Sequence, residues 1–196
     1  MRHAIAFIIV SLAASIIGIG SAWFALQGDL RFQKVQIGQW NIWPKAADPS
    51  ADPYTKAYLA RTGKTWMSTT EGLAFFSNKD SKGEQYASNC EYKLTGIIPR
   101  GRLWTLSYFE TGKNQGATNP TYITSEDVIW SEDDQLEIYI SKTAQPGNWL
   151  PLTSKSHFSL VLRIYDTPLT SGALDAAIKT PLIAVSYTHL TLPTKA

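Results

Sequence analysis

The sequence is poor in cysteine, histidine and net charge, and each shortage argues against a class of protein. The single cysteine, Cys90, excludes a disulfide within the chain and a cysteine-rich zinc site. His157 is the only histidine outside the two ends, which argues against a histidine-based metal centre. Without Arg2 and Lys195, which lie in terminal segments, the 18 basic residues fall to 16 and equal the 16 acidic ones. A neutral body without a cluster of Lys and Arg argues against nucleic acid as a partner.

Catalytic signatures are also lacking. The chain has no GxSxG elbow, P-loop, GxGxxG or HExxH motif. Histidine-assisted catalysis would have to use His157, whose place before an apolar run is typical of a turn or surface residue. Nothing in the sequence identifies a base that would activate Cys90 as a nucleophile. We expect no metal and no cofactor, and no catalytic residue is identified.

A long apolar run opens the chain. Residues 4–26 carry no charged side chain, and 23 residues at about 1.5 Å rise can cross a hydrocarbon core of about 30 Å. The run is longer than a signal-peptide core and continues through Trp23 and Phe24, which favours a retained membrane anchor. The small residues Gly20 and Ala22 have the spacing of a signal-peptidase site, so a cleaved signal peptide is the second interpretation. A buried core helix is the third interpretation. Residues 1–28 are assigned to this segment.

Residues 29–184 are expected to form one domain with a single short helix. Asp52 is a suitable N-cap, Pro53 suits the first helical position, and Gly63 can end the helix after about ten residues. Hydrophobic types make up 44% of the chain, enough for one ordinary core.

Beyond the helix the apolar pattern alternates with a period of two, which predicts strands. Asp133 and Asp134 separate residues 128–130 from residues 136–140 and predict a hairpin, with Trp104 and Trp130 in strands of the core. Short strands between Gly, Pro, Asn and Asp turns predict a mainly β fold, a jelly-roll-like antiparallel β-sandwich. The clearest strands are expected at residues 92–95, 103–109, 136–140 and 158–164.

Several polar and aromatic residues are candidates for binding. Arg163 interrupts an aliphatic strand, where a half-buried guanidinium requires a carboxylate partner or marks an anion site. Seven tryptophans could line a sugar- or lipid-binding groove, and Trp149 lies in a turn-rich segment. Carboxylates such as Glu71 are alternatively solvated turn and edge residues. The candidate ligand-binding residues are Arg102, Asn148, Trp149, Arg163, Glu71 and Arg61.

The last twelve residues, VSYTHLTLPTKA at 185–196, do not continue the composition before them. Residues 185–194 are what the codons GTC TCT TAT ACA CAT CTG ACG CTG CCG ACG encode, a string that resembles the adapter of transposase-made sequencing libraries. We expect this segment to be adapter read-through rather than native sequence, with a genuine polar tail as the alternative.

Seven blocks follow one another between Gly38 and Ile183: GQWNIWP, DPYTKAYLARTG, EGLAFF, CEYKLTG, RLWTLSYF, GNWLPL and FSLVLRIYDTP. In this order they resemble the bacterial domain-of-unknown-function family 1214, in a short form with one membrane-spanning helix. The resemblance implies a jelly-roll-type β-sandwich and an envelope protein of Gram-negative bacteria. It also implies a cysteine near the terminus, so a disulfide from Cys90 is expected in the intact protein. It implies no catalytic residues.

Three functions remain open. The leading hypothesis is a single-pass protein of the bacterial inner membrane whose periplasmic domain binds a ligand or an envelope protein, lipid or glycan. A carboxylate-dependent hydrolase or isomerase using Glu71 with Arg61 is the second. A structural subunit of an envelope assembly is the third, and it predicts a broad apolar patch rather than a pocket.

Overall fold

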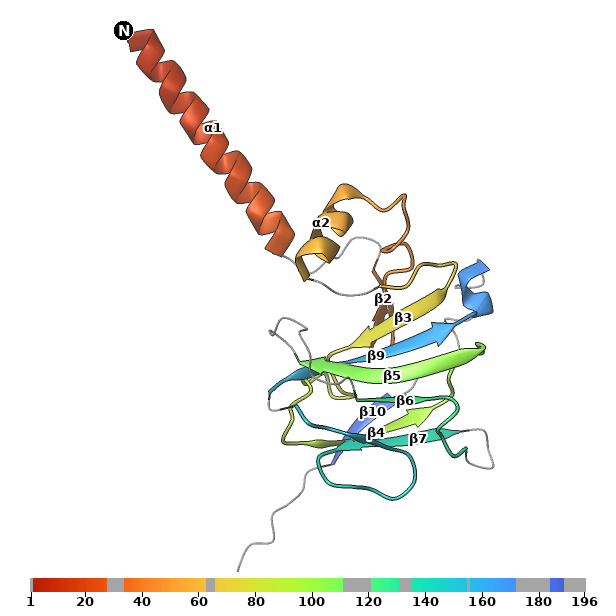
Figure 1. Cartoon of the computed structure of the whole chain (residues 1–196). Coiled ribbons are helices and arrows are strands. Elements are labelled where there is room, and N and C mark those ends of the chain that lie inside the picture. The colour runs from red at the N-terminus through yellow and green to blue at the C-terminus, as the bar shows by residue number, and fades with distance from the viewer. Residues whose placement is uncertain are drawn as a thin grey trace, which may run out of the picture.

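The structure is a computed structural model of the whole chain. It describes residues 2–27, 34–62, 66–110, 121–130, 135–154, 156–171 and 184–188. Helix α1 (Arg2–Gln27) projects away from a β body, and Figure 1 shows it in red at one side of the molecule. Its apolar side chains are exposed, so α1 does not belong to the core of the body. Its length and composition allow it to cross a membrane, and a signal sequence meets the same criterion.

The body is mainly β and contains two sheets (Figure 1). The first sheet has six strands in the order β1-β2-β3-β9-β5-β6, all paired antiparallel. The sheet centres on β9, which pairs with β3 on one side and β5 on the other. Its strands are β1 (Val35–Ile37), β2 (Trp40–Ile42), β3 (Gly72–Ser77), β5 (Leu103–Glu110), β6 (Tyr122–Thr124) and β9 (Phe158–Tyr165).

The second sheet has four strands in the order β10-β4-β7-β8. Two of its three pairings, β10 with β4 and β4 with β7, are antiparallel as predicted, whereas β7 and β8 run parallel. In Figure 1 the strands β4, β7 and β10 lie on the side of the body away from the helices. The strands are β4 (Glu91–Gly96), β7 (Leu136–Ser141), β8 (Trp149–Pro151) and β10 (Ala184–Thr188).

The two sheets share one hydrophobic core. The predicted alternation is confirmed in β7, where Leu136, Ile138 and Ile140 are buried and Glu137 is exposed. The β9 run is buried on both faces over most of its length, which explains its nearly continuous apolar sequence. Large side chains from both sheets are fully buried, among them Trp40, Phe75, Leu94, Leu106, Ile138, Leu150, Phe158 and Leu160.

A smaller cluster covers the outer face of the six-stranded sheet. Ala74, Phe76 and Val161 are its buried members. Trp43 and Trp66, from the long connection between β2 and β3, pack on them. This second layer is the reason β3 and β9 carry apolar residues on both faces.

Helix α2 (Pro53–Thr62) lies within that connection and confirms the predicted start. The Asp52 carboxylate accepts a hydrogen bond from Thr55 N at 3.0 Å and one from the Thr55 hydroxyl. These bonds hold the pKa of Asp52 below its usual value, as expected for an N-cap. The predicted cap at Gly63 lies outside the described residues.

The expected hairpin between residues 128–130 and 136–140 is wrong. Residues 128–130 form no strand, and β7 pairs instead with β4 and β8. The reason is that the side chain of Asn148 binds the backbone of Ile129 and holds this segment as a loop. Trp130 is therefore 44% exposed rather than in the core, although its ring contacts that of buried Trp104 edge-on at 6.4 Å.

Strand β10 begins at Ala184 and pairs antiparallel with β4, Ala184 opposite Thr95 and Thr188 opposite Glu91. Its residues 185–188 belong to the segment that codon comparison sets apart as adapter read-through. The origin of that segment stays a prediction.

Candidate functional site

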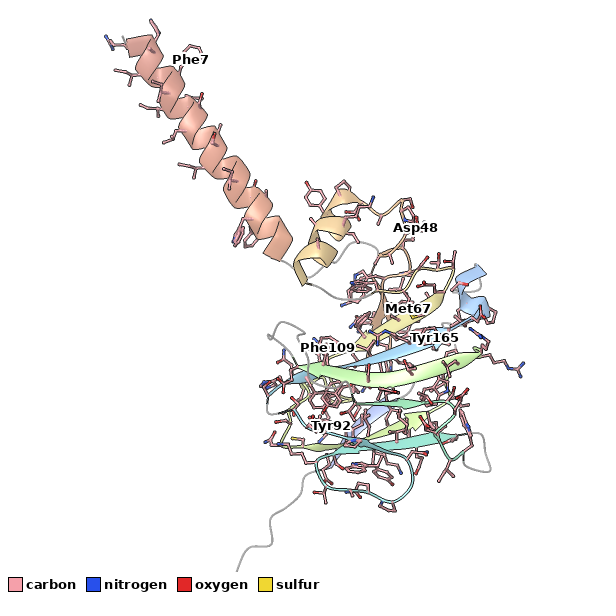
Figure 2. All side chains as sticks on the ribbon, viewed as in Figure 1. Phe7, Asp48, Met67, Tyr92, Phe109 and Tyr165 are labelled. Atoms are coloured by element: carbon pink, nitrogen blue, oxygen red, sulfur yellow. The ribbon has the colours of Figure 1, made fainter. Side chains whose placement is uncertain are left out.

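The described residues line a groove of about 600 Å³ at one edge of the six-stranded sheet. Its walls come from the β1–β2 hairpin, the end of β3 and the turn that follows β3. Phe109 near the end of β5 and Ser159 near the start of β9 complete it, and these two residues are paired in register. Figure 2 places Phe109 toward one end of β5 and Tyr165 toward the opposite end of the neighbouring β9. The groove therefore occupies one end of the outer face of the sheet.

The lining of the groove is polar and basic. Three lysines and one aspartate give it a formal charge of +2. The three lysine side chains, Lys34, Lys79 and Lys82, are exposed, while Asp80 is buried. The groove also carries four side-chain amides, those of Gln36, Gln39, Asn41 and Asn78. This combination can bind an anionic group and hydroxyls beside it.

Asp80 holds the turn between Lys79 and Glu84. Its Oδ1 accepts hydrogen bonds from the backbone N–H of Lys82 and of Glu84, each at 2.9 Å. Gly83 closes the turn with φ 84°, a conformation that glycine adopts without strain. The carboxylate is thus engaged by backbone donors, and its role is to fix the positions from which Lys79 and Lys82 project.

An aromatic cluster forms the inner wall of the groove. The rings of Trp43 and Trp66 meet edge-on at 4.7 Å, and Trp66 contacts Phe76 at 4.5 Å. Lys34 Nζ lies 5.9 Å from the centre of the Trp43 ring, within the range of a cation–π contact. Aromatic rings beside polar groups are typical of sites that bind amphipathic ligands.

Two buried polar atoms in this region have no hydrogen-bond partner among the described residues. They are Asn41 Oδ1, from a residue that lines the groove, and Trp66 Nε1. Buried polar atoms are almost always paired, so each unpaired atom points to a partner outside the described residues.

Arg163 lies on the same outer face, farther along β9, and its side chain is half-buried. Its Nη1 donates a hydrogen bond to Ser107 Oγ at 3.3 Å. No carboxylate of the described residues lies within ion-pair distance, so the expected structural ion pair is absent there. Burial lowers the pKa of Arg163, because the charged form loses hydration. The alternative of an anion site stays a prediction.

Asn148 and Trp149 have bonding that supports the fold. Asn148 is buried and uses its side-chain amide on the backbone of Ile129 and Glu137. Trp149 Nε1 lies 3.2 Å from both the carbonyl oxygen and the hydroxyl of Ser141 and donates to them. Neither residue lines the groove.

Arg102 and Glu71 lie at the opposite end of the six-stranded sheet, where each contacts Asp166. Arg102 Nε forms an ion pair with Asp166 Oδ2 at 3.0 Å, and the Asp166 N–H donates to Glu71 O at 3.0 Å. Both charged side chains of the pair are largely exposed, 77% and 62%, so the pair contributes little to stability. Arg61 lies in α2, and its side chain is outside the described residues.

The five candidates whose side chains the structure describes are therefore not gathered into one site. Among the described residues, no group of three His, Cys, Asp or Glu side chains is placed to hold a metal ion. Cys90 is a half-buried free thiol, and its disulfide stays a prediction. The groove lysines were missed because Lys34 is far from Lys79 in sequence, and only pairing of β2 with β3 brings them together. The one available signal was the turn at residues 80–83.

A family model described as "Protein of unknown function (DUF1214)" matches residues 71–169. The chain belongs to this family. The matched part of the DUF1214 domain runs from the start of β3 to the turn after β9 and includes Lys79, Asp80 and Lys82. The resembling blocks before residue 71 lie outside the match.

Solved structures resemble this DUF1214 chain at low sequence identity. The crystal structure of the VPA0106 protein from Vibrio parahaemolyticus has a TM-score of 0.53 and 18% identity, over 71% of this chain and 36% of that one. An uncharacterized protein from Burkholderia cenocepacia has a TM-score of 0.43 and 16% identity, over 93% of this chain and 54% of that one. The chain thus spans 36% of the length of the Vibrio protein, and the likeness shows the fold alone. No curated protein matches the chain.

Proposed function

We propose that the chain is a membrane-anchored binding protein of the bacterial envelope, with its β body in the periplasm. Its groove binds a small anionic ligand that carries hydroxyl groups. The observation that carries the proposal is the composition of the groove, which Lys34, Lys79 and Lys82 line together with amide side chains and an aromatic wall.

The charge of the groove supports an anion. Three ammonium groups attract a phosphate or carboxylate, while Asp80 is already bound by backbone N–H groups. The amides of Gln36 and Asn78 offer both donors and acceptors, which suits neighbouring hydroxyls. Apolar lining from Trp43 and Phe76 suits the carbon skeleton of the same ligand.

Paired-carboxylate hydrolysis has less support. Among the described lining residues Asp80 is the one carboxylate, and it holds a turn. Glu71, the acid of the alternative hypothesis, lies at the other end of the sheet, where its Oε2 accepts from Ser68 N at 3.4 Å. A glycosidase-like mechanism requires two carboxyl groups about 5–10 Å apart across the substrate. Binding is therefore the better-supported function.

The test is calorimetric titration of the full chain, kept in an uncharged polyoxyethylene detergent, with glycerol 1-phosphate and with glycerol. We expect the phosphate to bind and glycerol not to bind. Raising the salt concentration should weaken binding, because the lysines are exposed and screened. The variant K34Q/K79Q/K82Q should bind at least about tenfold more weakly.

The matched control is K45Q/K56Q/K142Q, which removes the same charge from exposed lysines outside the groove. It should bind like the unmodified chain. Equal loss in both triple variants, or failure of glycerol 1-phosphate to bind at all, would overturn the proposal.

A structural subunit remains a second candidate, supported by one observation. Ile129 is 71% exposed and Trp130 is 44% exposed, on a loop that Asn148 holds in place. Exposed apolar residues on a fixed loop are typical of protein contacts. If this loop binds a partner, I129S/W130S should lower the apparent mass of the protein on native gels of solubilised membranes. An unchanged mass would contradict this role.

A further inference from the structure

We infer that the groove takes the phosphate-bearing headgroup of an anionic phospholipid from the same bilayer that holds α1. The inference rests on the ligand class proposed above and adds its source. Phosphatidylglycerol has the required chemistry, a phosphate with hydroxyls on the adjoining glycerol. Its phosphate would lie among the groove lysines and its hydroxyls at the amides.

The covalent connection keeps the groove near the membrane. Lys34 follows Gln27, the last residue of α1, by seven residues. Seven residues of chain span at most roughly 25 Å even when fully extended. Gln36 and Gly38, which also line the groove, belong to the hairpin that starts immediately afterwards. If α1 spans the bilayer, this part of the groove stays within reach of the lipid headgroups.

The arrangement of the elements agrees with this constraint. The C-terminal end of α1 lies beside α2, and the two helices are in contact. Figure 1 shows β2 and β3 as the labelled strands nearest α2, with β4 and β7 farther away. The groove, which is built at the β1–β2–β3 edge, is therefore on the helix side of the body.

Charge gives the groove a preference for anionic lipid. A bilayer with anionic lipids attracts basic residues near its surface by about 1 kcal/mol for each Lys or Arg. The attraction falls off within a Debye length of about 8 Å, so it acts on residues that the tether holds close. Lys45 and Lys56 are also exposed on this side of the body, in the connection between β2 and α2 and in α2 itself. Replacing these two lysines therefore tests the general attraction of basic residues to the bilayer surface, separately from lipid binding in the groove.

The experiment is native mass spectrometry of the full chain, released from polyoxyethylene detergent micelles with equimolar phosphatidylglycerol and phosphatidylcholine. The measured quantity is the ratio of the two lipids bound. We expect phosphatidylglycerol to exceed phosphatidylcholine by about fivefold or more. The groove variant K34Q/K79Q/K82Q should bring the ratio close to one, and K45Q/K56Q/K142Q, with the same net charge, should keep the preference.

A ratio near one for the unmodified chain, or equal loss in both triple variants, would overturn the inference. If glycerol 1-phosphate still binds in the calorimetric test, the groove takes a soluble ligand and only the lipid source is wrong. If neither binds, the proposed function fails as well. Far-UV circular dichroism checks that each variant is folded, and K34Q and K79Q alone replace the triple variant if it is not, each with a smaller expected loss.

Discussion

The side-chain amide of Asn148 binds the backbone of Ile129 at both of its polar groups. It accepts from Ile129 N at 2.7 Å and donates to Ile129 O at 2.8 Å, and it also donates to Glu137 O at 2.9 Å. Because Asn148 is buried, N148A would leave three backbone groups unpaired, at a cost of about 1–3 kcal/mol in unfolding free energy. Urea unfolding followed by tryptophan fluorescence measures the loss.

The variant N148D tests the hydrogen bonds separately from side-chain packing, because aspartate has nearly the same shape as asparagine. The carboxylate can accept from Ile129 N but cannot donate to either carbonyl, so it should destabilise nearly as much as alanine. N89A, at an exposed asparagine, should have little effect. An N148A variant as stable as the parent would show that this amide does not hold the loop.

Gly72 allows a close approach between β3 and β9. Its φ is +153°, and a Cβ there would lie 2.1 Å from Ile164 O and 2.8 Å from Met67 Cε. G72A should lower the unfolding free energy by about 2 kcal/mol or more, since the contacting oxygen belongs to the backbone. The control is G147A, where φ is +81° but nothing lies within 4 Å, and the expected cost is only about 1 kcal/mol. Thermal unfolding of both variants compares the two effects, and equal losses would count against the contact.

Arg163 is expected to contribute no net stability. Its guanidinium is half-buried, hydrogen-bonds to Ser107 Oγ, and lacks a carboxylate partner among the described residues. R163L removes a desolvated charge and keeps apolar packing, so the unfolding free energy should stay within about 1 kcal/mol of the parent or rise. Binding of glycerol 1-phosphate should not change, because Arg163 does not line the groove. A loss of several kcal/mol by chemical denaturation would indicate a carboxylate partner after all.

Two buried tyrosines predict a loss of stability in alkali. Burial raises the pKa of Tyr86 and of Tyr92 above their usual value of 10.0. Above about pH 10 the unfolded chain therefore releases tyrosine protons that the folded chain retains, and stability falls as the pH rises further. Below that pH the contribution is fully present. The unfolding free energy measured between pH 8 and pH 11 should show this decrease.

The variant Y86F should show a shallower decrease above pH 10, because one fully buried phenol no longer ionises on unfolding. At neutral pH it should lose about 1 kcal/mol, since the Tyr86 hydroxyl forms a hydrogen bond of 2.8 Å with Ser77 Oγ. Y122F, at a tyrosine that is 60% exposed, should retain the parent profile. If the unfolding free energy falls with pH equally steeply in Y86F and in the parent, the alkaline loss of stability does not come from Tyr86.

Much of the fold could be predicted from local sequence patterns. The α2 start at Asp52, the apolar α1 and the alternation in β7 each depend on residues close together in the chain. The loop at residues 128–130 could not be predicted in this way, because Asn148, 19 residues after Ile129, decides its path. The parallel β7–β8 pair is likewise outside the reach of turn signals. The mainly β prediction is confirmed, and the jelly-roll path stays a prediction.

The candidate site was less predictable. Tryptophan, arginine and asparagine were chosen by residue type, yet Asn148 and Trp149 bond to the backbone of their own sheet. The groove lysines come from segments that are distant in the sequence. Pairing of β2 with β3, in which Asn41 lies opposite Phe76, brings these segments together. Local sequence predicts which side chains of a strand are buried and which are exposed. The composition of a groove depends instead on pairings between distant strands.

The most direct test of binding in the groove is lysine footprinting of the full chain with and without glycerol 1-phosphate. Lysine acetylation is followed by peptide mass spectrometry in uncharged polyoxyethylene detergent. Our account predicts slower labelling at Lys34, Lys79 and Lys82 in the presence of the phosphate, and unchanged labelling at the exposed lysines outside the groove, Lys45, Lys56 and Lys142. Unchanged labelling at all six, or equal protection of both sets, would contradict it.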